Sequence, residues 1–144
     1  MPQTIESLPC GLTLRQDDRF FKLGQDSVLL SSFARPRRNA KVLDLGCGTG
    51  ALALLIYRPD LKITGLELQE GALDLFRQSI ADNGVDNITA LHGDLRQIRT
   101  LLPHGSMDYV ICNPPYFDRN AGKNAPSPEK RTARQDACCT VEDI

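Results

Sequence analysis

Four consecutive residues, Asn113-Pro114-Pro115-Tyr116, combine a side-chain amide, two prolines and an aromatic ring. They follow the apolar run 107–112, which predicts a buried strand. A rigid amide at the carboxyl end of a strand, beside a stacking surface, is suited to bind a flat substrate that carries an amine. Because Asn-Pro also occurs in ordinary turns, and Tyr116 could instead fill a gap in the core, the motif needs support from elsewhere in the chain.

A second motif, Asp44-Leu45-Gly46-Cys47-Gly48-Thr49-Gly50, follows a predicted strand and opens a predicted helix. Its three glycines allow the backbone to approach a ligand without Cβ clashes. The spacing is G-x-G-x-G, whereas pyrophosphate binders carry G-x-G-x-x-G. The negative charge of Asp44 before the loop favours a cationic ligand group, such as an ammonium or a sulfonium.

Two further acidic residues lie at the carboxyl end of a predicted strand or just after it. Glu67 could accept hydrogen bonds from both hydroxyls of a ribose. Asp94 could accept one from an adenine amino group, while Leu95 offers an apolar face and a backbone amide. Each acid also has a structural alternative: Asp44 could cap a helix, Glu67 could be a solvated strand end, and Asp94 could be a helix N-cap. Together the three acids lie at the carboxyl ends of three successive strands, where ligands bind in open α/β sheets.

The elements that position these residues alternate along the chain. This alternation predicts an α/β fold with a parallel sheet and right-handed crossovers, in which the first and fourth strands are neighbours and Asn113 faces the glycine loop. We expect strands at 41–45, 61–68, 87–92 and 107–113, with helices at 51–57, 69–83 and 95–102.

The segment before this sheet predicts a short hairpin and one helix. Residues 10–22 alternate loosely between apolar and polar types, and residues 26–34 have helical character. We expect Asp26 or Ser27 to cap that helix. The apolar residues expected to face inward are Val28, Leu29, Leu30 and Phe33.

Composition narrows the class of protein. A chain of 144 residues with a net charge of -1 fits one domain and is no polycation. The sequence shows neither a signal peptide nor an apolar stretch near the roughly 20 residues of a membrane span. Its five cysteines include no Cys-x-x-Cys pair, so we expect no zinc or other metal site and a reducing, cytoplasmic environment.

The glycine loop and its acids resemble the class I S-adenosylmethionine-dependent methyltransferases. The resemblance implies a Rossmann-like fold, with helices on both faces of the sheet, that binds S-adenosylmethionine. The rival interpretation, a Rossmann-type oxidoreductase, requires a third glycine one residue later and gives the motif at 113 no role. By resemblance, the cofactor contacts are Asp44, Gly46, Gly48 and Gly50 for the methionine and ribose part, Glu67 with Leu68 for the ribose, and Asp94 with Leu95 for the adenine.

Asn-Pro-Pro-Tyr resembles the amino-methyltransferase signature of this family, which acts on exocyclic base amines and on the glutamine side-chain amide. The resemblance implies that the Asn113 side-chain oxygen and the Pro114 carbonyl bind the substrate N–H groups. Pro115 completes the rigid motif, Tyr116 stacks on the planar substrate, and Asn113 also lies against the cofactor. No metal takes part in this scheme.

The segment from Phe20 to Leu30 resembles the corresponding part of the bacterial tRNA adenine-N6-methyltransferases of the small-domain type. This implies adenine N6 of tRNA as the methylated atom, and Gln25 and Asp26 as further cofactor contacts; the alternative for these two is a simple helix start. Two other substrates stay open, namely glutamine N5 of a protein and guanine N2 of ribosomal RNA.

We expect residues 1–38 to form an N-terminal hairpin and helix extension, and residues 39–144 a partial S-adenosylmethionine-binding catalytic core. Family members carry about seven strands and this chain supplies four, so we expect the C-terminal strands to be missing. A cofactor-binding fragment without turnover is therefore a competing hypothesis. A modestly basic tail could contact RNA phosphates or be a solvated face; it comprises Lys123, Lys130, Arg131 and Arg134.

Overall fold

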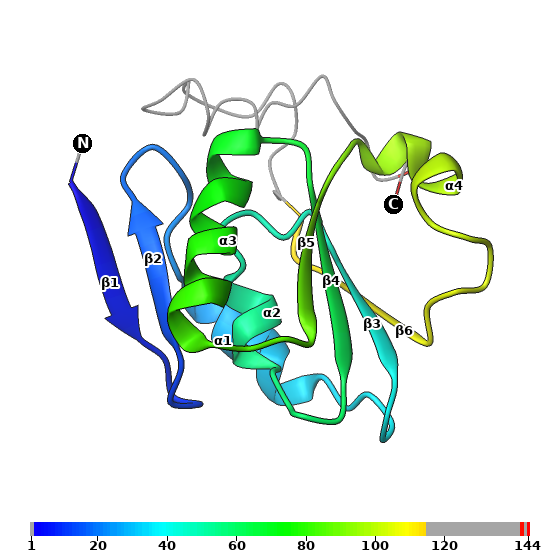
Figure 1. Cartoon of the computed structure of the whole chain (residues 1–144), viewed down its shortest axis with the longest axis horizontal. Helices are drawn as coiled ribbons and strands as arrows, with labels where there is room; N and C mark the ends of the chain where they lie inside the picture. The colour runs from blue at the N-terminus through cyan, green and yellow to red at the C-terminus, as the bar shows by residue number, and fades with distance from the viewer. Residues whose placement is uncertain (1, 115–141, 143) are drawn as a thin grey trace.

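A computed structural model describes residues 2–114, 142 and 144. The predictions for Pro115, Tyr116 and the basic tail fall outside these residues. The described chain forms a two-stranded hairpin and a four-stranded sheet with flanking helices (Figure 1).

The larger sheet is parallel and has the strand order β5-β4-β3-β6. The first and fourth strands of the predicted series, β3 and β6, are neighbours, so the predicted sheet and its switch point are confirmed. At most of the strand ends, the observed boundary differs from the predicted one by one or two residues. The strands are β3 (Lys41–Leu45), β4 (Lys62–Glu67), β5 (Ile88–His92) and β6 (Tyr109–Cys112).

Helices cover both faces of this sheet, as expected. Val42 and Ile63 join one apolar cluster with residues of α2 (Ala51–Leu55) and α3 (Glu70–Asn83). The intervening strand residues, which point to the opposite face, pack against the short 3-10 helix η1 (Leu95–Gln97) and α4 (Ile98–Leu101). Gly84 ends α3 in the left-handed conformation, with φ 62°, which is the role its position predicts.

The N-terminal hairpin lies earlier in the chain than predicted. It consists of β1 (Gln3–Ser7) and β2 (Thr13–Asp17), which pair antiparallel. All five residues of β1 are exposed, so the strand carries no apolar alternation that sequence reasoning could detect. The second strand packs on α3, where Ser79 Oγ accepts a hydrogen bond from the Arg15 backbone nitrogen at 2.9 Å.

The prediction for the helix before the sheet is wrong in two respects. Helix α1 (Gln25–Phe33) begins at Gln25, and Gly24, which supplies no side-chain cap, occupies the N-cap position instead of Asp26 or Ser27. Most of the expected inner face is exposed, because α1 packs mainly against α2 and none of its residues is buried. Leu30 packs against the core, whereas Val28, Leu29 and Phe33 are exposed, Phe33 by 76%.

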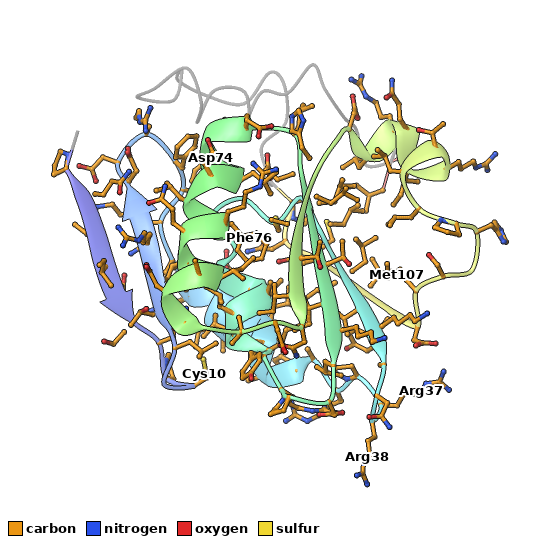
Figure 2. The ribbon with its side chains drawn as sticks, viewed as in Figure 1. Cys10, Arg37, Arg38, Asp74, Phe76 and Met107 are labelled. Carbon is orange, nitrogen blue, oxygen red and sulfur yellow. The ribbon has the colours of Figure 1, made fainter. Side chains whose placement is uncertain are left out.

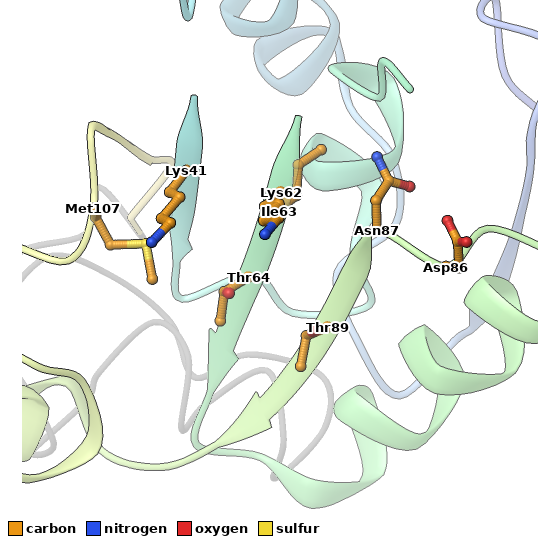
Figure 3. Close-up of a pocket in the computed structure, with 8 residues that line it drawn as sticks. All are labelled: Lys41, Lys62, Ile63, Thr64, Asp86, Asn87, Thr89 and Met107. Atoms are coloured by element: carbon orange, nitrogen blue, oxygen red, sulfur yellow. The ribbon is translucent and has the colours of Figure 1, made fainter. Parts of the chain in front are cut away.

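A groove lies on the sheet face near the amino ends of the strands (Figure 3). It is lined by Lys41, Lys62, Thr64, Thr89 and Met107, among others. Ligands in open α/β sheets bind at the opposite, carboxyl edge, so this groove is not the candidate active site. None of the helices in the described residues has the length and apolar character needed to cross a membrane.

Candidate active site

The carboxyl edge of the sheet brings three predicted site residues into one row. Leu45 pairs with Leu66 on one side and with Cys112 on the other. The next residue of each strand is therefore Gly46, Glu67 or Asn113, and these three lie side by side at the point where the strands end. The predicted juxtaposition of Asn113 and the glycine loop follows from this register.

Hydrogen bonds to the neighbouring strand hold the glycine loop in place. The backbone nitrogens of Gly46 and Cys47 both donate to the Leu66 carbonyl at 2.9 Å. Gly50 donates to the Cys47 carbonyl, also at 2.9 Å. Gly46, Gly48 and Gly50 all have positive φ, at 71°, 55° and 90°, which is the region that glycine enters without steric cost.

The ring of Phe76 packs against the glycine loop at Gly50. Phe76 is fully buried on α3 and lies between that helix and the sheet (Figure 2). A Cβ atom at Gly50 would lie 2.0 Å from the ring, and one at Gly65 on β4 would lie 2.5 Å from it. Two glycines therefore create the space that the ring fills, which fixes α3 against both the loop and the strand.

Glu67 is a structural part of the loop rather than a solvated strand end. Its side chain is buried, with 9% exposure. Oε2 accepts a hydrogen bond from the Gly48 nitrogen at 2.8 Å, and Oε1 accepts one from the Gln69 nitrogen at 2.9 Å. The carboxylate thereby joins the glycine loop to the turn that carries Leu68.

Asp44 lies beneath the loop and is almost completely buried, with 1% exposure. Its carboxylate accepts a hydrogen bond from the backbone N–H of Ala53 in α2, whereas the N-cap of that helix is Gly50. Within the described residues the second oxygen, Oδ2, has no hydrogen-bond partner. Burial, together with the nearby charge of Glu67, raises the pKa of Asp44 to about 7 although the Ala53 hydrogen bond lowers it.

Asp94 takes the helix-capping role that was its alternative. It is the N-cap of η1, and its Oδ1 accepts a hydrogen bond from the Arg96 backbone nitrogen at 2.9 Å. The Arg96 guanidinium also contacts both carboxylate oxygens and holds the pKa of Asp94 below its ordinary value. Next along the chain, Leu95 packs against the apolar cluster on the sheet face.

His92, the last residue of β5, and Gly93, which follows it, connect this region to the end of β4. The carbonyl of Leu68 lies 2.9 Å from Nε2 of His92, and the Gly93 nitrogen donates to the carbonyl of Glu67 at 3.0 Å. The loop after β4 and the loop before Asp94 are thus attached to each other at the carboxyl edge.

Helix α1 reaches the same edge through Ser27. Asn113 Nδ2 donates a hydrogen bond to Ser27 Oγ at 3.2 Å, across 86 positions of sequence. Gln25 and Asp26, the predicted contacts, precede Ser27 on α1 and are exposed. In residues 2–114, their side chains make no hydrogen bond to the glycine loop or to the acids.

Sequence reasoning missed three functional neighbours. Ser27 was expected only as a possible helix cap, and neither Phe76 nor Arg96 was assigned to the site. Arg96 carried a signal, because a cation two residues after a strand-end acid is placed to pair with it. Nothing in the sequence marks Ser27 as the partner of Asn113. Among the described residues, no group of three or more His, Cys, Asp or Glu side chains could hold a metal ion.

Comparison with known proteins agrees with this geometry. The family model described as methyltransferase small domain matches residues 23–126. Two relatives, both named tRNA1(Val) (adenine(37)-N6)-methyltransferase, are 33% identical over 112 residues in Vibrio campbellii and 36% identical over 112 residues in Aliivibrio fischeri. These alignments cover 76% of this chain but only 45% and 46% of the relatives, so the chain spans about half their length.

A solved structure shares the fold. The 16S rRNA N2 G1207 methyltransferase of T. thermophilus, in complex with AdoMet and guanosine, is 25% identical with a TM-score of 0.66. The match covers 80% of this chain and 33% of that one. The matched family model includes α1, the glycine loop, Glu67, Asp94 and Asn113. The chain therefore belongs to the methyltransferase small domain family.

Proposed function

We propose that this chain carries the cofactor-binding and catalytic residues of an S-adenosylmethionine-dependent N-methyltransferase that acts on an exocyclic amine, adenine N6 of tRNA. One observation carries the proposal: Asn113 lies in the same row of the sheet edge as Gly46 and Glu67. A methyl donor on the glycine loop and an amine held at Asn113 would therefore be neighbours.

The acidic residues at the carboxyl edge of the sheet fit this cofactor. The orphaned, buried Oδ2 of Asp44 suits a ligand that brings a donor or a positive charge, because a buried carboxylate is costly without a partner. A carboxylate offers about four acceptor sites, so Glu67 can accept from ribose hydroxyls in addition to its two backbone donors. Asp94 would accept from the adenine amino group beside Leu95. Gln25 and Asp26 would close the methionine end from α1.

The amine chemistry rests on Asn113 and its neighbours. The lone pair of an exocyclic amine is delocalised into its ring and must localise before it attacks the methyl group. The Asn113 side-chain oxygen and the Pro114 carbonyl would accept the two N–H groups and aim the nitrogen at the methyl. Pro115 and Tyr116 would complete the motif, the latter by stacking, which contributes about 1–3 kcal/mol per base in single-strand binders. Orientation would supply much of the rate.

The substrate assignment follows the relatives named tRNA1(Val) (adenine(37)-N6)-methyltransferase. Guanine N2 of ribosomal RNA is the second candidate, favoured by the likeness to the T. thermophilus enzyme. Glutamine N5 of a protein is the third, because the same four-residue signature serves an amide. We place the reaction in the cytoplasm, in line with the reducing environment that the sequence predicts.

The proposal is tested by methyl transfer from radiolabelled S-adenosylmethionine to unmodified tRNA. We expect transfer that falls at least about a hundredfold in Asn113→Ala and persists in Gln78→Ala, an exposed amide on α3 that serves as the control. Altering the anticodon loop of the tRNA should abolish transfer, whereas the activity of an enzyme that methylates a protein would not depend on that loop. Binding of the cofactor by calorimetry without any transfer would instead support the non-catalytic fragment.

A further inference from the structure

Two polar contacts, one near each end, attach α1 to β6. At the first end, Asn113 Nδ2 donates to Ser27 Oγ at 3.2 Å. At the second, the Arg35 backbone nitrogen donates to the Tyr109 hydroxyl at 3.2 Å. An ion pair just beyond, between Arg37 and Asp108 at 2.8 Å, reinforces the second end. Helix and strand therefore run in opposite directions, with the start of α1 beside the carboxyl end of β6.

The spacing of the two contacts matches on both elements. From Ser27 the chain advances about 10 Å along the helix to Ala34, the C-cap, at 1.5 Å per residue, and one extended step of about 3.3 Å leads from Ala34 to Arg35. From Tyr109 to Asn113 a strand advances about 13 Å, at 3.3 Å per residue. Because the two lengths agree, both contacts can form at once without distortion of either element.

Apolar packing alone holds α1 weakly. None of its nine residues is fully buried, and Leu30 is the member that packs against the core. A marginal helix of this kind owes its position to the few specific contacts that it makes. The hydrogen bond between Ser27 and Asn113 therefore acts on both partners: it holds α1 at the sheet edge, and it holds the amide of Asn113.

The amide of an asparagine needs such a partner to have one orientation. Rotation about χ2 of asparagine is broad, so an unsupported carboxamide samples a wide range of angles. The nitrogen is a donor and the oxygen an acceptor. When the nitrogen donates to Ser27, the orientation of the carboxamide plane is restricted, and with it the direction of the oxygen.

We propose that Ser27 is a positioning residue of the active site, whose hydroxyl, supported by α1, fixes the plane of the Asn113 carboxamide and with it the direction of the oxygen that receives the substrate amine. This inference rests on the proposed function of Asn113. It adds a role for α1, because the helix that precedes the sheet then orients a group of the substrate site.

The first test concerns the amide itself and needs no activity. In the ¹⁵N-labelled chain, the side-chain NH₂ signals of Asn113 are assigned by their loss in Asn113→Ala. We expect Ser27→Ala to shift these two signals and to speed their exchange with water, and Ser27→Thr to restore them. The matched control is Ser32→Ala, since Ser32 Oγ donates at 2.6 Å to the Leu29 carbonyl of its own helix. Unchanged Asn113 signals in Ser27→Ala would overturn the inference.

The second test separates positioning from general stability. We expect Ser27→Ala to lower kcat for tRNA methylation about fivefold to tenfold, the factor that corresponds to one neutral hydrogen bond. The KM for S-adenosylmethionine should change less than kcat does, and Ser27→Thr should restore kcat. Equal kcat in Ser27→Ala and Ser32→Ala would refute the role.

The two tests distinguish a failure of the inference about Ser27 from a failure of the function proposed for Asn113. A chain in which Asn113→Ala transfers as well as the wild type contradicts the function proposed for Asn113. The NMR signals decide independently whether Ser27 orients that amide.

Discussion

The Oε2 atom of Glu67 lies 2.8 Å from the backbone nitrogen of Gly48, at the centre of the glycine loop. The last residue of β4 therefore holds the loop that follows β3. Glu67 therefore supports the backbone of the loop, in addition to the ligand-binding role proposed for it.

Replacing Glu67 by glutamine should damage this support. Glutamine keeps one acceptor oxygen, so one of the two backbone donors now served by Glu67 would lose its partner, at a cost of about 1–3 kcal/mol. We expect a lower melting temperature and at least a tenfold loss of affinity for S-adenosylmethionine in titration calorimetry. Glu70→Gln, at an exposed position of α3, is the control. Equal affinities in the two variants would contradict the supporting role.

The glycines of the loop should differ sharply in their tolerance of alanine. A Cβ at Gly50 would lie 2.0 Å from the buried Phe76 ring, so we expect Gly50→Ala to cost about 3 kcal/mol or more in unfolding free energy. Gly48 has φ 55° and no atom within 4 Å of its Cβ position, so Gly48→Ala should cost only the left-handed strain of about 1–2 kcal/mol. Urea unfolding measures both variants, and a smaller loss at position 50 would disprove the packing argument.

Asp44 should make stability depend on pH. Since burial raises its pKa to about 7, the folded protein binds this proton more tightly than the unfolded chain does. The contribution of Asp44 to stability is then complete below about pH 4 and is lost as the pH rises through about 7. Asp44→Asn carries no titrating group, so its melting temperature should fall less than that of the wild type between pH 5 and pH 8.

As the control, Asp74→Asn at an exposed position of α3 should keep the wild-type dependence of the melting temperature on pH.

The affinity for the cofactor provides a second measurement of the Asp44 charge. If the cationic group of the cofactor pairs with ionised Asp44, its affinity should rise between pH 6 and pH 8 in the wild type and stay flat in Asp44→Asn. A flat profile in both proteins would show that the ligand does not draw on this carboxylate.

Arg96 should compete with the cofactor for Asp94. Its guanidinium contacts both carboxylate oxygens, whereas the helix cap uses the Arg96 backbone nitrogen, which any residue at 96 supplies. We therefore expect Arg96→Ala to raise the affinity for S-adenosylmethionine a few-fold, and Asp94→Ala to lower it. Arg99→Ala on α4 is the matched control. Weaker binding in Arg96→Ala would mean that the arginine itself assists the ligand.

The sheet and the position of the site were predictable because they depend on strong local patterns. Apolar strands alternating with helices fix a parallel sheet, and the order of the strands then places Gly46, Glu67 and Asn113 at one edge. The same reasoning failed for β1, whose side chains are all exposed, and for α1, whose apolar residues remain largely in solvent. Neither element satisfies the premise that apolar residues mark the buried face.

The hydrogen bonds inside the site were not predictable. Ser27 and Asn113 are 86 positions apart, and their contact depends on how α1 lies along β6. The raised pKa of Asp44 likewise depends on its depth beneath the loop, which its place in the motif does not reveal. Spacing therefore predicted which residues gather at the carboxyl edge of the sheet, whereas tertiary packing decided which side chain supports which.

Helix α3 connects the hairpin to the glycine loop. Near its C-terminal end, Asn83 holds Thr13 of β2 through both its amide oxygen and its amide nitrogen, at 2.8 and 2.7 Å. In its middle, Phe76 fills the space beneath Gly50. A ligand that immobilises the loop would thus also restrain α3 and, through it, β2. Amide hydrogen exchange in the hairpin, for which no part in the chemistry is proposed, should slow when the cofactor binds.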